Sequence, residues 1–211
     1  MKQALKIILM SRWLKAAVFI ACLVPAVRLY WRYEHHTLGI NWVEAAQRWT
    51  GDWILRFLII TLCITPLRKV PGLNPVIRYR RMLGLFAFFY ALIHFSIYLF
   101  YDKQLDWLDM RDDFTIRRFY IFGLIAFLSL IPLAITSTKG WIRRLGPRWQ
   151  TLHRLVYLAA ASGAFHYYLQ GKSFVFRAFV YCVIVALLLL YRVVMWLRKL
   201  RPVAGQMAVR S

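Results

Sequence analysis

The stretch MLGLFAFFYALIHFSIYLFY, residues 82–101, runs for twenty residues without an Asp, Glu, Lys or Arg. A helix of about 20 apolar residues crosses the roughly 30 Å hydrocarbon core of a bilayer. A second charge-free run of the same length, FYIFGLIAFLSLIPLAITST, occupies residues 119–138. Both runs predict helices that span a membrane, and they decide the fold class, which is an all-α membrane protein.

Four further segments are shorter or carry an arginine near one end. Snorkelling of arginine side chains toward the membrane surface allows such segments to span. They cover about residues 13–30, 53–67, 151–169 and 174–197. Hydrophobic residues make up 61% of the chain, and no long stretch is left outside the spans to bury a second core. The sequence therefore predicts a single domain, residues 1–211, folded as a six-transmembrane helix bundle.

The charged residues divide into two sets along the chain. Lys and Arg gather before residue 16, at 68–81, at 139–148 and after residue 197, whereas all eight acidic residues lie in the alternate segments. Loops rich in Lys and Arg remain in the cytoplasm, so both termini are predicted to be cytoplasmic. Membrane topology also explains the net charge of +21 without nucleic acid as a partner, because no nucleic-acid-binding motif is present.

Two of the five histidines lie inside apolar runs at matched depth. His94 follows Arg81 by thirteen residues, and His166 comes roughly fifteen residues after the start of its own predicted helix. At 1.5 Å per residue, both lie about 20 Å from the inner side. Iron in a b-type haem takes one nitrogen ligand on each side of the porphyrin plane, so the pair predicts a haem site. Hydrogen bonding across helices is the alternative.

A third histidine, His153, lies thirteen residues before His166, at the inner edge of the same predicted span. It predicts a second haem, stacked below the first across the bilayer. On a straight helix, however, thirteen steps of 100° would turn the two rings about 140° apart. The alternative is an interfacial residue whose ring bonds a loop carbonyl.

Two longer stretches carry a resemblance to a known family. They are RRMLGLFAFFYALIHFSIYL, residues 80–99, and LAITSTKGWIRRLGPRWQTLHRLVYL, residues 133–158, with His166 following thirteen residues after His153. Together they resemble the ferric-reductase-like transmembrane family, and within it the haem-binding membrane subunits of periplasmic methionine sulfoxide reductase systems. His94, His153 and His166 of this chain match the positions of the haem ligands in that family.

The resemblance implies a multi-pass protein of the bacterial inner membrane that binds one or two b-type haems, with FMN also associated with the family. Such a subunit would take electrons from the quinone pool and pass them to a periplasmic molybdopterin-dependent catalytic subunit. That partner would reduce methionine sulfoxide in oxidised envelope proteins. The chain is therefore expected to be an electron-transfer subunit of an oxidoreductase complex. From their predicted side and exposure, the acidic loop 102–113 with Trp107 and the outer loop around Glu34 to Asp52 with Trp42 and Trp49 are candidates for docking the partner; ordinary solvated loops are the alternative.

The sequence departs from the broader family pattern before His94. That pattern has a second histidine where this chain has Arg80 and Arg81. An inner haem would then need another ligand, such as Met82 or water. The two arginines are expected either to bind haem propionates or a cofactor phosphate, since guanidinium matches such oxygens, or to act only as topogenic charges. No nucleotide-binding motif is present, so direct oxidation of NADPH is not expected.

Two alternative functions belong to other classes. One is a small membrane transporter, which the lack of carboxylates inside the spans and of a detectable repeat of the halves disfavours. The other is a haem-free membrane scaffold. Neither explains why His94 and His166 lie at the same depth.

Overall fold

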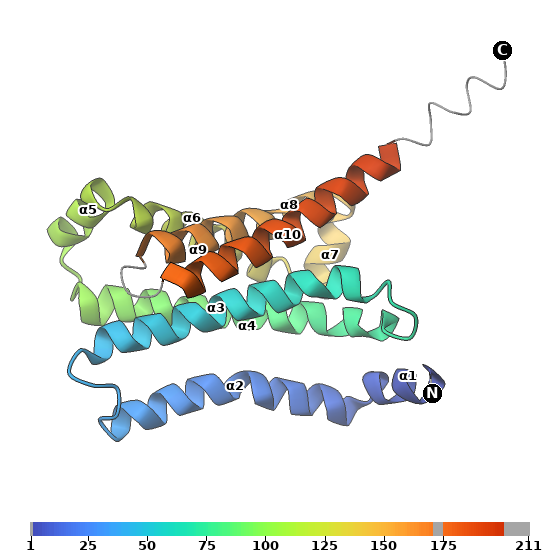
Figure 1. Ribbon diagram of the computed structural model, residues 1–211, viewed down its shortest axis with the longest axis horizontal. Coiled ribbons are helices and arrows are strands. Elements are labelled where there is room, and N and C mark those ends of the chain that lie inside the picture. The colour runs from blue at the N-terminus through green and yellow to red at the C-terminus, as the bar shows by residue number, and fades with distance from the viewer. Residues whose placement is uncertain (1, 171–174, 201–211) are drawn as a thin grey trace, which may run out of the picture.

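Every element of the computed structural model, which describes residues 2–170 and 175–200, is helical (Figure 1). The helices are α1 (Lys2–Met10), α2 (Arg12–Glu34), α3 (Trp42–Leu67), η1 (Asn74–Tyr79), α4 (Arg80–Ile97), η2 (Tyr98–Asp102), α5 (Trp107–Ile116), α6 (Arg118–Ile135), α7 (Lys139–Leu145), α8 (Pro147–Leu152), α9 (Leu155–Gln170) and α10 (Val175–Leu200). The all-α prediction is thus confirmed for this part of the chain. Phe174, the first residue of the sixth predicted span, and the tail after residue 200 lie outside it.

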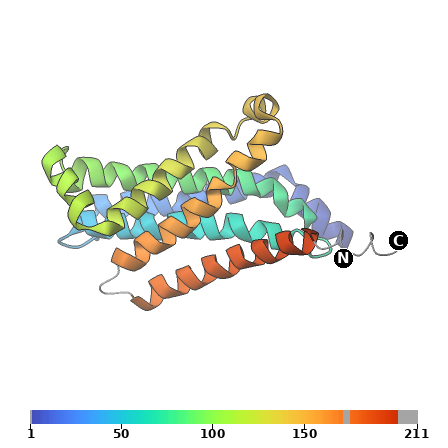
Figure 2. The ribbon, with the colours of Figure 1, turned by 90° about the horizontal axis from the view of Figure 1, so that it is seen from above.

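Five helical segments of the described residues are long and apolar enough to cross a membrane. They are Arg12–Glu34, Trp42–Leu67, Asn74–Asp102, Arg118–Ile135 and Phe176–Arg198. The fifth predicted span corresponds to α9, which has 16 residues and is about 24 Å long. Figures 1 and 2 nevertheless place α9 along the bundle beside its neighbours. Six spans with both termini in the cytoplasm therefore stay a prediction.

The bundle has two ends that differ in charge. At the basic end lie the connections 68–79 and 136–154, and at the acidic end lie the connections 35–41 and 103–117 (Figure 1). Helix α2 begins and helix α10 ends at the basic end. The predicted separation of charge along the chain is therefore also a separation in space.

The outer loop predicted between Glu34 and Asp52 is wrong in its extent, because α3 already begins at Trp42. The side chain of Asn41 accepts a hydrogen bond from the backbone N–H of Glu44, which caps the helix, and the Glu44 carboxylate lies in the first turn. A capping residue and an early acidic residue both stabilise a helix start. The predicted acidic loop likewise contains α5, whose first turn is capped by Asp106.

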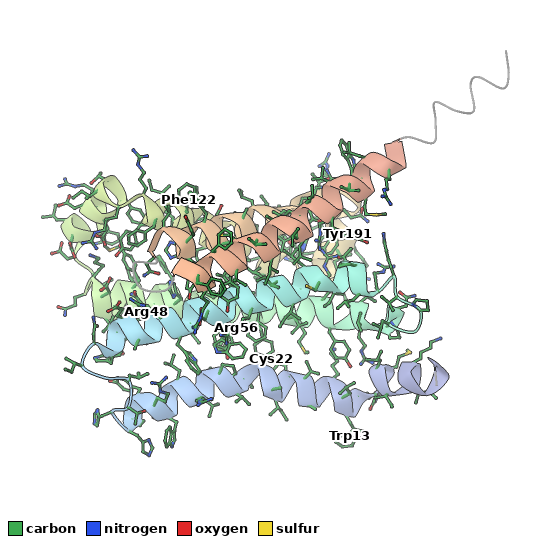
Figure 3. The ribbon with its side chains drawn as sticks, in the orientation of Figure 1. Trp13, Cys22, Arg48, Arg56, Phe122 and Tyr191 are labelled. Atoms are coloured by element: carbon green, nitrogen blue, oxygen red, sulfur yellow. The ribbon has the colours of Figure 1, made fainter. Side chains whose placement is uncertain are left out.

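Helix α2 contains Pro25, which cannot continue the ladder of backbone hydrogen bonds. The hydroxyl of Tyr90, a fully buried residue of α4, inserts into this ladder. It accepts from the backbone N–H of Ala26 at 2.9 Å and donates to the carbonyl of Cys22 at 2.8 Å. The side chain of Cys22 faces α3 and α4, whereas Trp13 points away from the bundle (Figure 3). These contacts attach α2 to the rest of the bundle.

A second proline, Pro66, leaves the carbonyl of Leu62 in α3 without its usual backbone donor. Arg192 of α10 donates to that carbonyl at 2.6 Å and to the carbonyl of Leu188 at 2.7 Å. The guanidinium thereby satisfies two backbone acceptors near the basic end. The core itself is built mainly by two closely packed helix pairs, α3 with α4 and α6 with α9.

Candidate functional site

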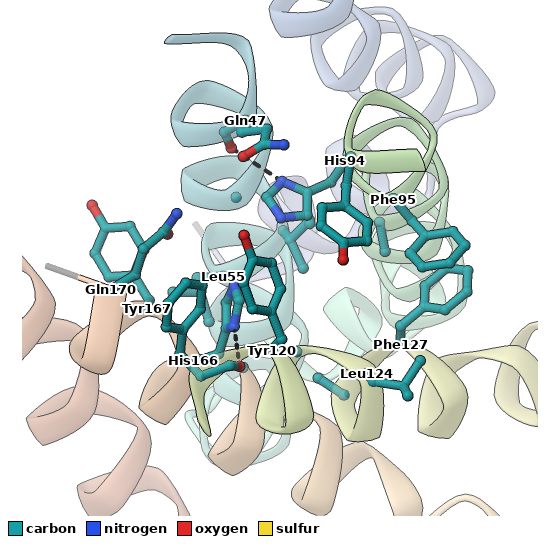
Figure 4. A pocket seen from close by; sticks show the side chains of 18 of the residues that line it. Gln47, Leu55, His94, Phe95, Tyr120, Leu124, Phe127, His166, Tyr167 and Gln170 are labelled. Atoms are coloured by element: carbon teal, nitrogen blue, oxygen red, sulfur yellow. Dashed lines mark hydrogen bonds between the residues drawn. The ribbon is translucent and has the colours of Figure 1, made fainter. Parts of the chain in front are cut away.

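A cavity lies between the two closely packed helix pairs, nearer the acidic end (Figure 4). Its walls are mostly apolar, and Phe114 of α5 contributes to its outer side. The space between the side chains is about 1000 Å³, including the part that is open to the outside. The cavity therefore has the polarity of a site for an apolar group.

His94 of α4 and His166 of α9 enter this cavity from different helices (Figure 4). Their ring centroids are 6.3 Å apart and their planes are almost perpendicular, at 88°. An imidazole nitrogen lies about 2 Å from a bound transition metal and about 1 Å from the centre of its own ring. Two rings on opposite sides of one metal ion would thus have centroids about 6 Å apart. The observed separation fits this arrangement.

The hydrogen bonds of the two rings fix which nitrogen faces the cavity. Nδ1 of His166 lies 2.6 Å from the carbonyl oxygen of Phe119, and Nδ1 of His94 lies 3.1 Å from that of Gln47. A carbonyl can only accept, so each Nδ1 must carry the proton and donate it. Each Nε2 then has a free lone pair. Metal-binding histidines usually have this arrangement, with the second ring nitrogen donating to a backbone carbonyl.

Glycines in the facing helices make room for the two rings. A Cβ atom on Gly123 of α6 would lie only 2.8 Å from Nδ1 of His166, whereas a Cβ on Gly51 of α3 would lie 3.5 Å from Cε1 of His94. An isolated glycine in a helix costs about 1 kcal/mol relative to alanine and usually has a packing reason. Close approach of the histidine is that reason at Gly123.

The remaining predicted site residues gather in a second cavity at the basic end. Arg80, Arg81 and His153 line it together, apart from His94 and His166. The hydroxyl of Thr136 lies 3.1 Å from Nε2 of His153 and donates to the carbonyl of Pro132, so it accepts from the histidine.

Two sequence expectations about His153 need correction. The His153 ring bonds the hydroxyl of Thr136, whereas a loop carbonyl was the partner expected for an interfacial residue. The angle of about 140° expected between the His153 and His166 rings on a straight helix also does not apply, because α8 ends at Leu152 and α9 begins only at Leu155. His153 therefore lies at a break between helices, and its direction is not tied to that of His166.

The tryptophans expected to dock a partner differ in exposure. Trp107 of α5 is 73% exposed, but Trp49 is part-buried and donates to the carbonyl of Pro25, and Trp42 packs between Tyr33 and Tyr101. Only α5 thus keeps an exposed tryptophan from the predicted set.

Sequence reasoning missed the groups that hold the rings in place. Thr50 of α3, which is fully buried, has its hydroxyl 3.0 Å from Nδ1 of His94. The carbonyls of Gln47 and Phe119 carry no signal in the sequence, because every residue has one. Gly51 and Gly123, which lie inside helices and face the histidine rings, are the sequence signal that could have indicated these contacts. Among the described residues, no three His, Cys, Asp or Glu side chains gather as a metal-binding group.

Comparison with known proteins agrees with this geometry. Residues 50–164 match the family described as "Ferric reductase like transmembrane component". A protein of Herminiimonas arsenicoxydans is 50% identical over 183 residues, which cover 85% of this chain and 84% of that protein. A protein of Polaromonas naphthalenivorans is 42% identical over 208 residues, covering 94% and 95% of the two chains. One of Brucella ovis is 41% identical over 193 residues, covering 91% and 87%.

All three relatives carry the name "Protein-methionine-sulfoxide reductase heme-binding subunit MsrQ". The matched family segment contains His94 and His153 but ends at residue 164, two residues before His166. The relatives extend the similarity over most of the chain. The family match and these identities together show that the chain belongs, with the MsrQ proteins, to the ferric reductase-like transmembrane component family.

Proposed function

We propose that this chain is the haem-binding membrane subunit of a methionine sulfoxide reductase system and carries electrons across the bilayer through haem b held between His94 and His166. One observation carries the proposal. Two histidines of different helices have ring centroids 6.3 Å apart in an apolar cavity, and the Nδ1 of each donates to a backbone carbonyl. Nitrogen lone pairs are thereby directed at a common space.

The chain's own residues would hold the cofactor and set its properties. A haem, when bound, accepts and releases one electron at a time. The two neutral imidazoles would hold the iron, and the apolar walls would keep water away from it. Ligand type, burial and hydrogen bonds to the ligands are the means by which a protein sets a haem potential.

We place the electron entry at the basic end, in the cavity of Arg80, Arg81 and His153. A second haem or an FMN would fit the charge of this cavity, because guanidinium groups bind propionate and phosphate oxygens in a bidentate manner. Quinol from the membrane, or a reduced flavin at the inner side, is the proposed donor. This orientation makes the basic end cytoplasmic, in a six-span protein of the inner membrane.

The acidic end is then periplasmic and is the proposed docking side for a molybdopterin-dependent catalytic subunit, which would reduce methionine sulfoxide. Helix α5 supports this choice, because it lies at that end, beside the cavity, and carries the exposed Trp107. Exposed aromatic side chains are frequent at protein interfaces. Under this proposal the chain relays electrons and the partner performs the chemistry on the substrate.

The first test is the reduced-minus-oxidised visible spectrum of the detergent-purified protein, beside the variants His94→Ala and His166→Ala. The proposal predicts sharp b-type bands, and the bands of the haem held between His94 and His166 are lost in both variants. His35→Ala is a matched control, because His35 is exposed, near the acidic end and outside the cavity. Colourless wild-type protein from cells supplied with haem would refute the proposal and favour a transporter or a haem-free scaffold.

The second cofactor is tested separately in His153→Ala. Haem and flavin are extracted from equal amounts of wild-type and variant protein and measured. Loss of haem with retained His94 and His166 bands would indicate an inner haem, and loss of flavin would indicate FMN. Unchanged contents of both would exclude His153 as a cofactor-binding residue.

A further inference from the structure

The two helix pairs that enclose the histidine cavity are copies of one arrangement. Gly51 precedes His94 by 43 residues, and Gly123 precedes His166 by 43 residues. The two halves are thus offset by 72 residues. Helices α3 and α6 run from the acidic to the basic end, and α4 and α9 run back (Figure 1). In each half, the histidine lies against the glycine of the neighbouring helix.

The lining of the cavity follows the same offset. Each lining residue from α3, α4 and η2 has a counterpart 72 residues later among the lining residues of α6 and α9. Ala91 corresponds to Gly163, for example, and Leu58 to Leu130. The sequence shows no repeat because most equivalent residues differ in type. The repeat exists in the fold, which corrects the argument against a transporter that was based on its absence.

Each histidine is also held in the same way. In both halves, its Nδ1 donates to the carbonyl of the residue four positions before the glycine, which is Gln47 in one half and Phe119 in the other. One difference breaks this equivalence. Thr50 comes before Gly51, whereas the equivalent residue before Gly123 is Phe122, whose ring packs edge-on against Phe165. The hydroxyl therefore has no counterpart beside His166.

The direction of the hydrogen bonds around Thr50 can be assigned. Its hydroxyl lies 2.8 Å from the carbonyl of Ala46 and 3.0 Å from that of Gln47, both intrahelical acceptors of the kind that serine and threonine commonly use. The single hydroxyl proton is then engaged, so the oxygen can only accept from Nδ1–H of His94 at 3.0 Å. The His94 proton is thus shared between two acceptors, Thr50 Oγ1 and the Gln47 carbonyl, whereas that of His166 has one.

We propose that Thr50 is a positioning residue that makes His94 an axial ligand different in orientation and basicity from His166. The inference rests on the proposed haem function. An acceptor at Nδ1–H increases the basicity of a metal-binding imidazole, and a more basic ligand stabilises the oxidised metal. Thr50 therefore lowers the reduction potential of the haem. Two acceptors at 3.0 and 3.1 Å also restrict rotation of the His94 ring.

The test compares Thr50→Val, which removes the hydroxyl and keeps the shape, with Thr50→Ser, which keeps the hydroxyl. Ser129→Ala is the matched control, because Ser129 of α6 is buried and its hydroxyl also donates to the carbonyl four residues earlier, but it does not line the histidine cavity. Redox titration of the visible bands and the electron paramagnetic resonance spectrum of the oxidised protein are measured for each. Thermal unfolding is followed in parallel.

We expect T50V to shift the reduction potential upward and to alter the low-spin ferric signal. T50S and S129A should resemble the wild type. Equal potentials and signals in T50V and wild type would overturn the inference while leaving the haem function intact. Lower unfolding temperature without a shift in potential would assign Thr50 a structural role only, which also overturns it.

Two further outcomes are distinguishable. If T50V does not fold, Thr50→Cys replaces it, since a thiol accepts hydrogen bonds more weakly. A smaller upward shift is expected there, and no shift would overturn the inference. A wild-type protein without haem bands would instead refute the proposed function.

Discussion

Substitution of Gly123 by alanine tests most directly how His166 is held. The new Cβ would lie 2.8 Å from Nδ1 and 2.9 Å from Cε1 of the His166 ring. Carbon contacts of that length do not occur in folded proteins, so the ring must move away from α6. The short hydrogen bond from Nδ1 to the Phe119 carbonyl, now 2.6 Å, would then lengthen or break. The equivalent substitution Gly51→Ala brings a Cβ no closer than 3.5 Å to His94, which is ordinary contact.

The size of the effect follows from the hydrogen bond. Leaving a buried donor without its partner costs about 1–3 kcal/mol, which corresponds to an affinity for haem about 5-fold to about 150-fold weaker. Helix propensity acts in the opposite direction, since alanine stabilises a helix by about 1 kcal/mol relative to glycine. Unfolding of α6 would therefore not explain a loss of haem in Gly123→Ala.

The assay is haem content per protein after purification in detergent, followed by titration of haem into the depleted protein. Gly123→Ala is expected to bind weakly, and Gly51→Ala to bind almost as the wild type does. Full haem binding by Gly123→Ala would refute the reasoning that the Phe119 carbonyl and the glycine fix His166. Equal losses in both variants would refute the distinction between the two helix contacts.

Three other predictions concern different parts of the molecule. The 88° between the His94 and His166 planes predicts a highly anisotropic low-spin ferric signal in electron paramagnetic resonance, and a rhombic signal typical of parallel rings would contradict it. Tyr90→Phe leaves the inserted position in α2 without its hydroxyl, so the free energy of unfolding should fall by about 1–3 kcal/mol while the haem bands persist. Burial lowers the pKa of Lys103, but its hydrogen bonds to Asp109 and Asp113 raise the pKa more, so it lies above its ordinary value. The stability this ammonium contributes should be complete below about pH 10.4, the pKa of an unfolded lysine, and be lost as pH rises through the folded value. Lys103→Met, which removes the 2.6 Å ion pair with the buried Asp113 but leaves Arg117 3.7 Å from that carboxylate, should cost about 1–3 kcal/mol, and proteolysis of α5 would report it.

The fold was largely predictable because its main determinants are local. Apolar runs and charges placed the long helices, and counting residues placed His94 and His166 at one depth. The errors occurred where polar residues form helix, as at Glu44 in α3 and in α5, since caps and ion pairs there outweigh low hydropathy. The direction expected for the His153 ring was wrong because the chain does not continue as one helix there: α8 ends at Leu152 and α9 begins at Leu155.

The sequence by itself determined that this is a membrane protein, how many apolar segments it has, and that two imidazoles lie at equal depth in them. The hydrophobicity and charge of a segment decide by themselves whether that segment spans a membrane, so the spans can be predicted one by one along the chain. Only the tertiary structure decided that each ring donates to a backbone carbonyl, that a glycine faces each ring, and that Thr50 distinguishes one ring from the other. These contacts join residues more than 40 positions apart, and their geometry arises from the packing of helix against helix.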